Sequence, residues 1–87
     1  MDEKKFFEQL KANINKLKEM GFNDDQRNEI YFGLELNIDV TKYANPKFNS
    51  RQMYEIRRGL ESDVDVNIYA DPKFDYKQMY ELREGLE

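Results

Sequence analysis

The sequence predicts an all-α protein: a small helical-repeat bundle or short solenoid, with an N-terminal capping helix followed by 2.5 helix-turn-short-helix units. Three observations support this. The chain repeats itself every 26 residues, each copy has helix start and stop signals at matching places, and its apolar residues follow a helical period. We therefore expect one domain over residues 1–87, divided into a capping helix (1–21), two units (22–47 and 48–73) and a half unit (74–87).

The predicted capping helix runs from about residue 3 to residue 20. Its apolar residues recur at steps of three and four, and Gly21 is a natural helix end. Such a helix would cover the apolar face that the first unit of a repeat stack leaves open. The residues of its apolar stripe are Phe7, Leu10, Ile14 and Leu17.

The repeat becomes visible when three phenylalanines are aligned, because apolar residues, glycines, a glutamine and a glutamate then fall into register. Positions that recur within one chain are those that the unit itself needs, so we expect them to be structural anchors. The predicted anchors are Phe22, Phe48, Phe74, Met53, Met79, Ile30, Ile56, Leu82, Gly33, Gly59 and Gly85.

Each unit has its own signals for where its helices start and end, and these signals are clearest in the second copy. Asn49 with Gln52 predicts a capping box at the start of the longer helix. Asp63 can adopt the left-handed conformation that ends this helix, Asp65 can cap the short helix, and Pro72 ends that short helix.

The longer helix has one buried stripe. Met53, Ile56 and Leu60 share a face, and the same pattern places Arg57 off that face. Gly59 would cost about 1 kcal/mol in mid-helix relative to alanine. Its recurrence therefore predicts that a neighbouring helix packs closely against it.

Composition argues against catalysis. The 87 residues contain no Cys and no His, which removes thiol nucleophiles, imidazole acid/base chemistry and the usual metal ligands. No carboxylate pair stands out as an acid/base pair, so we expect no enzyme activity and no cofactor. Asp63, Asp65 and Asn67 copy the start of a calcium loop, but the later positions of that loop do not fit, and helix capping explains both acids.

Charge and hydropathy restrict the classes of partner and the cellular location that we expect. A net charge of −4, without a long Lys/Arg stripe, makes nucleic acid an unfavourable partner, although Arg51, Arg57 and Arg58 form a small basic cluster. No run of 18 apolar residues occurs, so we expect no membrane span and a cytoplasmic protein.

The segment from Tyr69 to Asp75, Tyr-Ala-Asp-Pro-Lys-Phe-Asp, is followed from Gln78 to Glu87 by Gln-Met-Tyr-Glu-Leu-Arg-Glu-Gly-Leu-Glu. Together they resemble a short helical repeat found in proteins of Gram-positive gut bacteria and their mobile elements and phages. The resemblance covers residues 22–87. It implies an accessory or interaction module and no particular biochemical activity.

Residues 14–44 are also similar to the three helices of a ubiquitin-associated domain. That resemblance implies that Met20, Gly21 and Phe22 form a ubiquitin-binding patch. The repeat gives another interpretation of the same triplet, because Phe48 and Phe74 match Phe22 without a preceding Met-Gly. The triplet is then a helix end followed by an anchor.

These observations favour a non-catalytic protein-binding module of a mobile element or phage. Large aromatic residues that vary between copies are the predicted contacts, because exposed aromatic rings are efficient interface anchors. An alternative is a small acidic inhibitor of a host defence nuclease, of the anti-CRISPR or anti-restriction type, that imitates DNA. The truncated third unit also leaves self-association open. The predicted contact residues are Tyr31, Phe32, Tyr54 and Tyr80.

Overall fold

The computed structural model describes residues 14–87 and is all-helical, as the sequence predicts. Most of the predicted capping helix lies outside the described residues. No strand occurs within residues 14–87, and no helix there is long and apolar enough to cross a membrane. The elements are the α-helices α2 (Ile14–Glu19), α3 (Asp24–Glu35), α4 (Ser50–Glu61) and α5 (Tyr76–Leu86), and the 3-10 helices η1 (Val40–Lys42) and η2 (Val66–Ile68).

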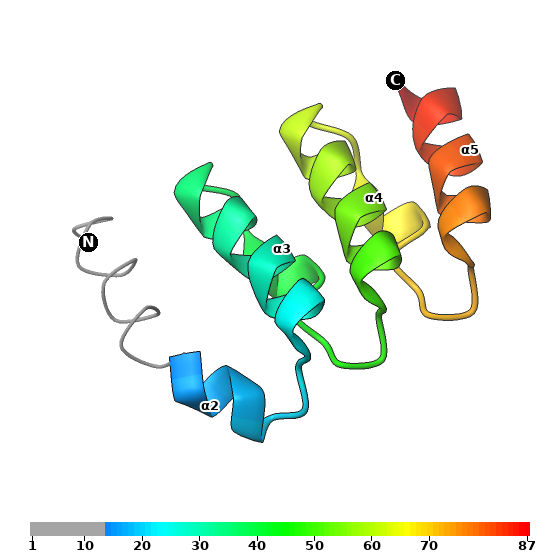
Figure 1. Ribbon diagram of the computed structural model, residues 1–87. Coiled ribbons are helices and arrows are strands. Elements are labelled where there is room, and N and C mark those ends of the chain that lie inside the picture. The colour runs from blue at the N-terminus through cyan, green and yellow to red at the C-terminus, as the bar shows by residue number, and fades with distance from the viewer. Residues whose placement is uncertain (1–13) are drawn as a thin grey trace.

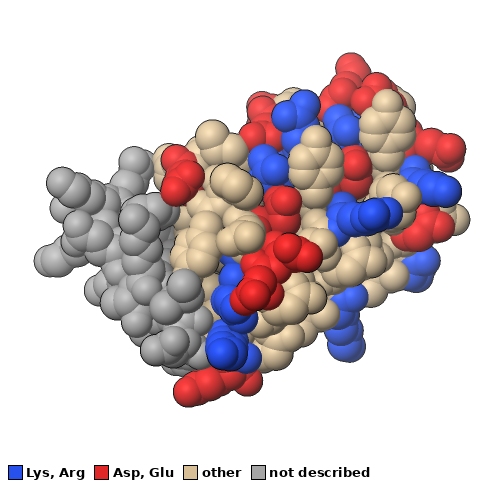
Figure 2. All heavy atoms as spheres, viewed as in Figure 1, with Lys and Arg blue, Asp and Glu red and all other residues tan. Residues whose placement is uncertain are grey.

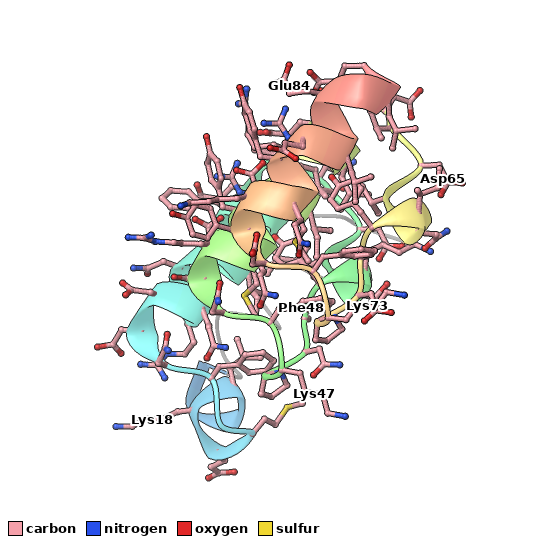
Figure 3. The ribbon with its side chains drawn as sticks, turned by 90° about the vertical axis from the view of Figure 1, so that its right-hand side faces the viewer. Lys18, Lys47, Phe48, Asp65, Lys73 and Glu84 are labelled. Atoms are coloured by element: carbon pink, nitrogen blue, oxygen red, sulfur yellow. The ribbon has the colours of Figure 1, made fainter. Side chains whose placement is uncertain are left out.

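The three longer helices α3, α4 and α5 lie side by side and run in the same direction (Figure 1). Each connection returns along the other side of the stack and carries one 3-10 helix. Seen edge-on, the long helices form one layer, and the segments that carry Lys47, Asp65 and Lys73 form the other (Figure 3). The parallel course follows from the repeat, since each unit supplies one long helix and one return segment.

All three long helices begin with the capping box that the sequence predicts. In α4 the Asn49 side chain accepts a hydrogen bond from the Gln52 backbone at 2.8 Å, and the Gln52 side chain accepts one from the Asn49 backbone at 2.8 Å. The same pair of bonds joins Asn23 with Gln26 and Asp75 with Gln78. Each box satisfies two donors that a helix start otherwise leaves free.

The predicted ends of α3 and α4 are confirmed as well. Asn37 and Asp63 have φ angles of 58° and 60°, so both occupy the left-handed region after α3 and α4. Asp65 then accepts a hydrogen bond from the Asn67 backbone and caps η2, which uses the carboxylate that a calcium loop would need. Within residues 14–87 no group of three or more acidic side chains is arranged to hold a metal ion.

Most of the predicted anchors lie in one continuous core. Phe74 and Leu82 are only partly buried, and Gly85 is exposed. Two tyrosines of the return segments are fully buried, and their hydroxyls find acceptors: Tyr43 donates to the Glu29 carbonyl at 2.6 Å, and Tyr69 to the Glu55 carbonyl at 2.8 Å. The buried apolar residues are Leu17, Phe22, Ile30, Val40, Tyr43, Phe48, Met53, Ile56, Val66, Tyr69 and Met79.

Gly33 and Gly59 leave room for the hydroxyl groups of these two tyrosines. A Cβ atom on Gly33 would overlap the Tyr43 hydroxyl, and one on Gly59 would overlap the Tyr69 hydroxyl. The expected close approach of a neighbouring helix is therefore present at Gly33 and Gly59. The neighbour is the short 3-10 helix that follows each long helix, together with the tyrosine that ends it. At Gly85 an added Cβ would meet nothing within 4 Å.

Candidate protein-binding surface

Three of the four predicted contact residues are exposed. Phe32, Tyr54 and Tyr80 expose 51%, 41% and 48% of their surface. Tyr31 differs, because it is only partly exposed and its hydroxyl is buried without a hydrogen-bond partner among residues 14–87. Burial raises the pKa of the Tyr31 hydroxyl, and a nearby Arg27 opposes that rise. Tyr31 is thus less available to a partner than the sequence suggests.

Arginine side chains flank the exposed rings. The Arg57 guanidinium lies between two aromatic rings, 5.7 Å from the centre of Phe32 and 5.2 Å from that of Tyr54. Arg83 lies 5.3 Å from the ring centre of Tyr80. These distances are within the range of cation–π attraction, which limits the freedom of the rings.

The same two arginines form ion pairs from helix to helix. Arg57 reaches back from α4 to the Glu29 carboxylate on α3 at 2.8 Å, and Arg83 reaches back from α5 to Glu55 on α4 at 3.1 Å. The Arg83 and Glu55 side chains expose only 7% and 8% of their surface. A pair as buried as this fixes neighbouring helices in register, because either charge alone would be poorly solvated.

The sequence interpretation of Arg57 was wrong on this point. The apolar stripe placed this residue off the buried face, whereas its side chain is only 11% exposed. A signal was present, because Glu29 and Glu55 align in the repeat and an arginine follows each at the same distance. Burial by itself lowers the pKa of Arg57, but the hydrogen bond and charge of Glu29 outweigh it, so the net pKa is raised.

Glutamine side chains add a second link between units. Besides its role in the capping box, the Gln26 amide donates to the Phe48 carbonyl at 2.6 Å, and the Gln52 amide donates to the Phe74 carbonyl at 2.7 Å. Each amide thus joins the start of one long helix to the segment that leads into the next. This explains why glutamine recurs at this position.

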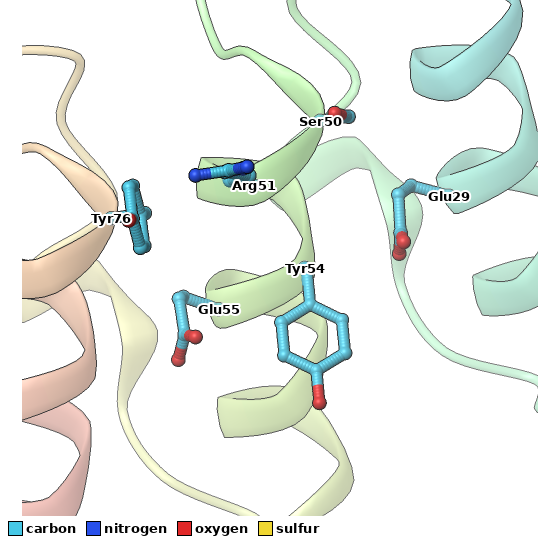
Figure 4. A pocket seen from close by; sticks show the side chains of 6 residues that line it. All are labelled: Glu29, Ser50, Arg51, Tyr54, Glu55 and Tyr76. Atoms are coloured by element: carbon cyan, nitrogen blue, oxygen red, sulfur yellow. The ribbon is translucent and has the colours of Figure 1, made fainter.

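Among the grooves formed by the described residues, two on the long helices are related by the repeat. The first has a volume of about 350 Å³, and Figure 4 shows Glu29 entering it from α3, Tyr76 from α5 and the rest of its lining from α4. The Arg51 guanidinium extends toward Tyr76, 5.0 Å from its ring centre. The lining residues are Glu29, Ser50, Arg51, Tyr54, Glu55 and Tyr76.

The second groove is formed by the residues of the next repeat unit that correspond to the lining of the first groove. Its volume is about 310 Å³, and every residue that lines it lies 26 positions after a lining residue of the first groove. A surface of repeated shape and chemistry therefore runs across the stack. The lining residues of the second groove are Glu55, Tyr76, Lys77, Tyr80 and Glu81.

We call Phe32, Tyr54, Tyr76 and Tyr80, with the two grooves that the three tyrosines line, the aromatic surface. Its members share neighbours: Arg57 contacts Phe32 and Tyr54, and Tyr76 lines both grooves. On the face seen in Figure 2, acidic and basic side chains alternate with uncharged ones. The described part of that face carries no extended acidic patch of the kind that a DNA mimic presents.

The three residues that resemble a ubiquitin-binding loop, Met20, Gly21 and Phe22, differ in how far they are buried. Met20 is 54% exposed, Gly21 has a φ angle of 96°, and Phe22 is only 3% exposed. Phe22 lies in the core next to the start of α3, and the Arg27 guanidinium donates to its carbonyl at 2.6 Å. Of the three, only Met20 presents a large side chain at the surface.

In comparisons with known proteins, no family model, no curated protein and no solved structure matches this chain.

Proposed function

We propose that this protein is a non-catalytic protein-binding module and that the aromatic surface is its contact surface. The observation that carries the proposal is the exposure of Phe32, Tyr54 and Tyr80, together with two grooves, related by the repeat, that Tyr54 and Tyr80 line. Large aromatic side chains held in place on a rigid scaffold contribute strongly to protein interfaces, because little conformational entropy is lost when they are covered.

The scaffold supports this role. Arg57 and Arg83 contact the Tyr54 and Tyr80 rings while their own guanidinium groups are paired with Glu29 and Glu55. The rings are therefore ordered before a partner arrives, which lowers the cost of binding. The resemblance of residues 22–87 to repeats of mobile elements and phages favours a partner encoded by such an element or by its host.

The test is a double substitution of Tyr54→Ser and Tyr80→Ser. Both side chains are exposed, so we expect the helical circular dichroism signal to persist while partner capture is lost. The intact protein is immobilised, exposed to lysate of its source cell and to lysate containing CRISPR or restriction nucleases, and the bound proteins are identified by mass spectrometry.

A matched control is Ile68→Ser, which removes an equally exposed apolar side chain, 53% exposed, from η2 in the other layer of the stack. Proteins that the Ile68 variant retains and the tyrosine variant loses are partners of the aromatic surface. A nuclease among them would define the module as an inhibitor. Retention of every bound protein by the tyrosine variant would rule out the aromatic surface as the contact surface.

A further inference from the structure

The outer face of α5 presents the groups that α4 uses to hold the segment that follows it. On α4, the Gln52 amide donates to the carbonyls of Pro72 and Phe74, at 3.3 and 2.7 Å. The Glu55 carbonyl accepts from the Tyr69 hydroxyl at 2.8 Å. In the same contact, the Glu55 carboxylate pairs with Arg83 at 3.1 Å.

Gly59 completes this binding face. The space that its missing Cβ leaves is filled by the Tyr69 hydroxyl and a methyl group of Val66. Residues 62–87 thus dock on α4 through five groups: two carbonyls, a tyrosine hydroxyl, an arginine and a branched apolar side chain. Leu60 packs beside them against the core.

On α5 the same set lies 26 positions later, and within the described residues its members have no such partners. The Gln78 side chain takes part only in its capping box, no cation pairs with Glu81, and the space beside Gly85 is open. Leu86, the counterpart of Leu60, is 41% exposed. Donor, carboxylate, open space and apolar side chain are therefore all free at once.

We propose that this outer face of α5, formed by Gln78, Glu81, Gly85 and Leu86, is a binding site for an unpaired repeat segment with the chemistry of residues 62–87. The required segment is defined by the contacts on α4. It carries a tyrosine three positions after a branched apolar residue, then Pro-x-Phe, then an arginine at the spacing of Phe74 to Arg83. Its arginine pairs with Glu81, and its tyrosine enters the space beside Gly85.

A second folded copy of this chain is a poor source of that segment. Its Tyr43 and Tyr69 hydroxyls and its Arg57 and Arg83 guanidinium groups are all engaged within the chain. It would have to break those contacts first. An unpaired repeat segment has no such cost, so it is the occupant that we propose.

This site adjoins the aromatic surface, because Glu81 also lines the second groove. Its test uses a defined probe. The probe is a fluorescently labelled peptide of residues 62–87 that carries Gly85→Val, which closes its own outer face to further peptides. We expect saturable binding to the intact protein by fluorescence anisotropy. Glu81→Gln and Gly85→Val in the protein should each weaken binding at least tenfold, and Tyr54→Ser should leave it unchanged.

Glu84→Gln is the matched control, because it removes the same charge from another exposed position of α5. We expect it to change the affinity less than threefold. A charge exchange gives the sharpest result: Glu81→Arg in the protein should abolish binding of the ordinary peptide and restore binding of a peptide carrying Arg83→Glu. Binding that ignores Glu81 and Gly85, or dimerisation of the protein through this face in preference to peptide binding, would overturn the proposal.

The isolated peptide must become ordered in order to bind, and a second experiment removes this requirement for two separate molecules. In it, a second copy of residues 62–87 is appended after Glu87. We expect the extended protein to melt at a higher temperature than the original. Glu81→Gln and Gly85→Val should remove that increase while leaving the original protein unchanged. An extension that adds no thermal stability, together with no peptide binding, would reject the site.

Discussion

Helices α4 and α5 are close copies of each other, yet they occupy different environments. Glu55 on α4 is 6% exposed and paired with an arginine, whereas Glu81 on α5 is exposed and has no ion pair among the described residues. Gly59 faces a buried tyrosine, whereas Gly85 faces open space. The same residue therefore contributes to stability in one helix and remains available for binding in the other.

The difference shows that a repeated position has no fixed energetic value. What sets that value is whether the next segment is docked against it, since in a repeat stack each unit interacts mainly with its neighbours. Matched substitutions in α4 and α5 should therefore have unequal effects, and the inequality measures what docking contributes.

The largest expected difference is at the glutamates. Glu55→Gln should lower the free energy of unfolding by about 3 kcal/mol, because it leaves the buried Arg83 guanidinium without its interhelical partner. Glu81→Gln should change it by less than about 0.5 kcal/mol. Urea unfolding followed by circular dichroism measures both values, and equal losses would contradict the comparison.

Alanine substitutions at Gly59 and Gly85 should change the stability of the protein in opposite directions. Gly59→Ala should destabilise the protein by about 2 kcal/mol, since the new methyl group displaces the Tyr69 hydroxyl and Val66. Gly85→Ala should stabilise it by about 0.5 kcal/mol, because alanine favours the helix and nothing lies in its way. Thermal melts of the two variants distinguish the outcomes, and a loss of stability at Gly85 would show that its surroundings are not open.

A smaller effect is expected at alkaline pH. Burial raises the pKa of Tyr69 from 10.0 to about 12, partly opposed by the charge of Arg83. The unfolded chain therefore releases this proton first, so the stabilisation is complete below pH 10 and is lost as the pH rises toward 12. Burial raises the pKa of Tyr43 in the same direction.

The measurement is the urea midpoint between pH 9 and pH 11.5. Tyr69→Phe should cost about 1 kcal/mol at neutral pH through the lost hydrogen bond to the Glu55 carbonyl. It should also make the decline above pH 10 shallower by up to about 1.4 kcal/mol per pH unit. Tyr80→Phe is the control, because that ring is 48% exposed, and it should leave the slope unchanged.

Local features of the fold could be predicted from the sequence because their causes are local. A capping box needs only Asn49 and Gln52 three positions apart, and a left-handed helix end needs only a residue such as Asp63 that tolerates it. The helical class and the starts of the long helices follow from such signals, and both are confirmed for residues 14–87. The predicted end of the short helix at Pro72 is wrong, because η2 already ends at Ile68.

The interhelical contacts could not be predicted in the same way. Arg57 belongs to no apolar stripe, so a helical pattern assigns it to solvent, although its long side chain reaches Glu29 on the preceding helix. The identity of the group beside Gly59 was missed for a related reason. Spacing shows that something approaches closely, but only the path of the return segment shows that it is Tyr69.

The return segments also decide how far apart in sequence the interacting groups lie. In residues 14–87, the Tyr43 hydroxyl bonds to a residue 14 positions away, the Gln26 amide to one 22 away, and Arg57 to one 28 away. Contacts this local close only short loops, which favours fast folding. A nascent chain can therefore complete the interface between α3 and α4 before α5 has left the ribosome.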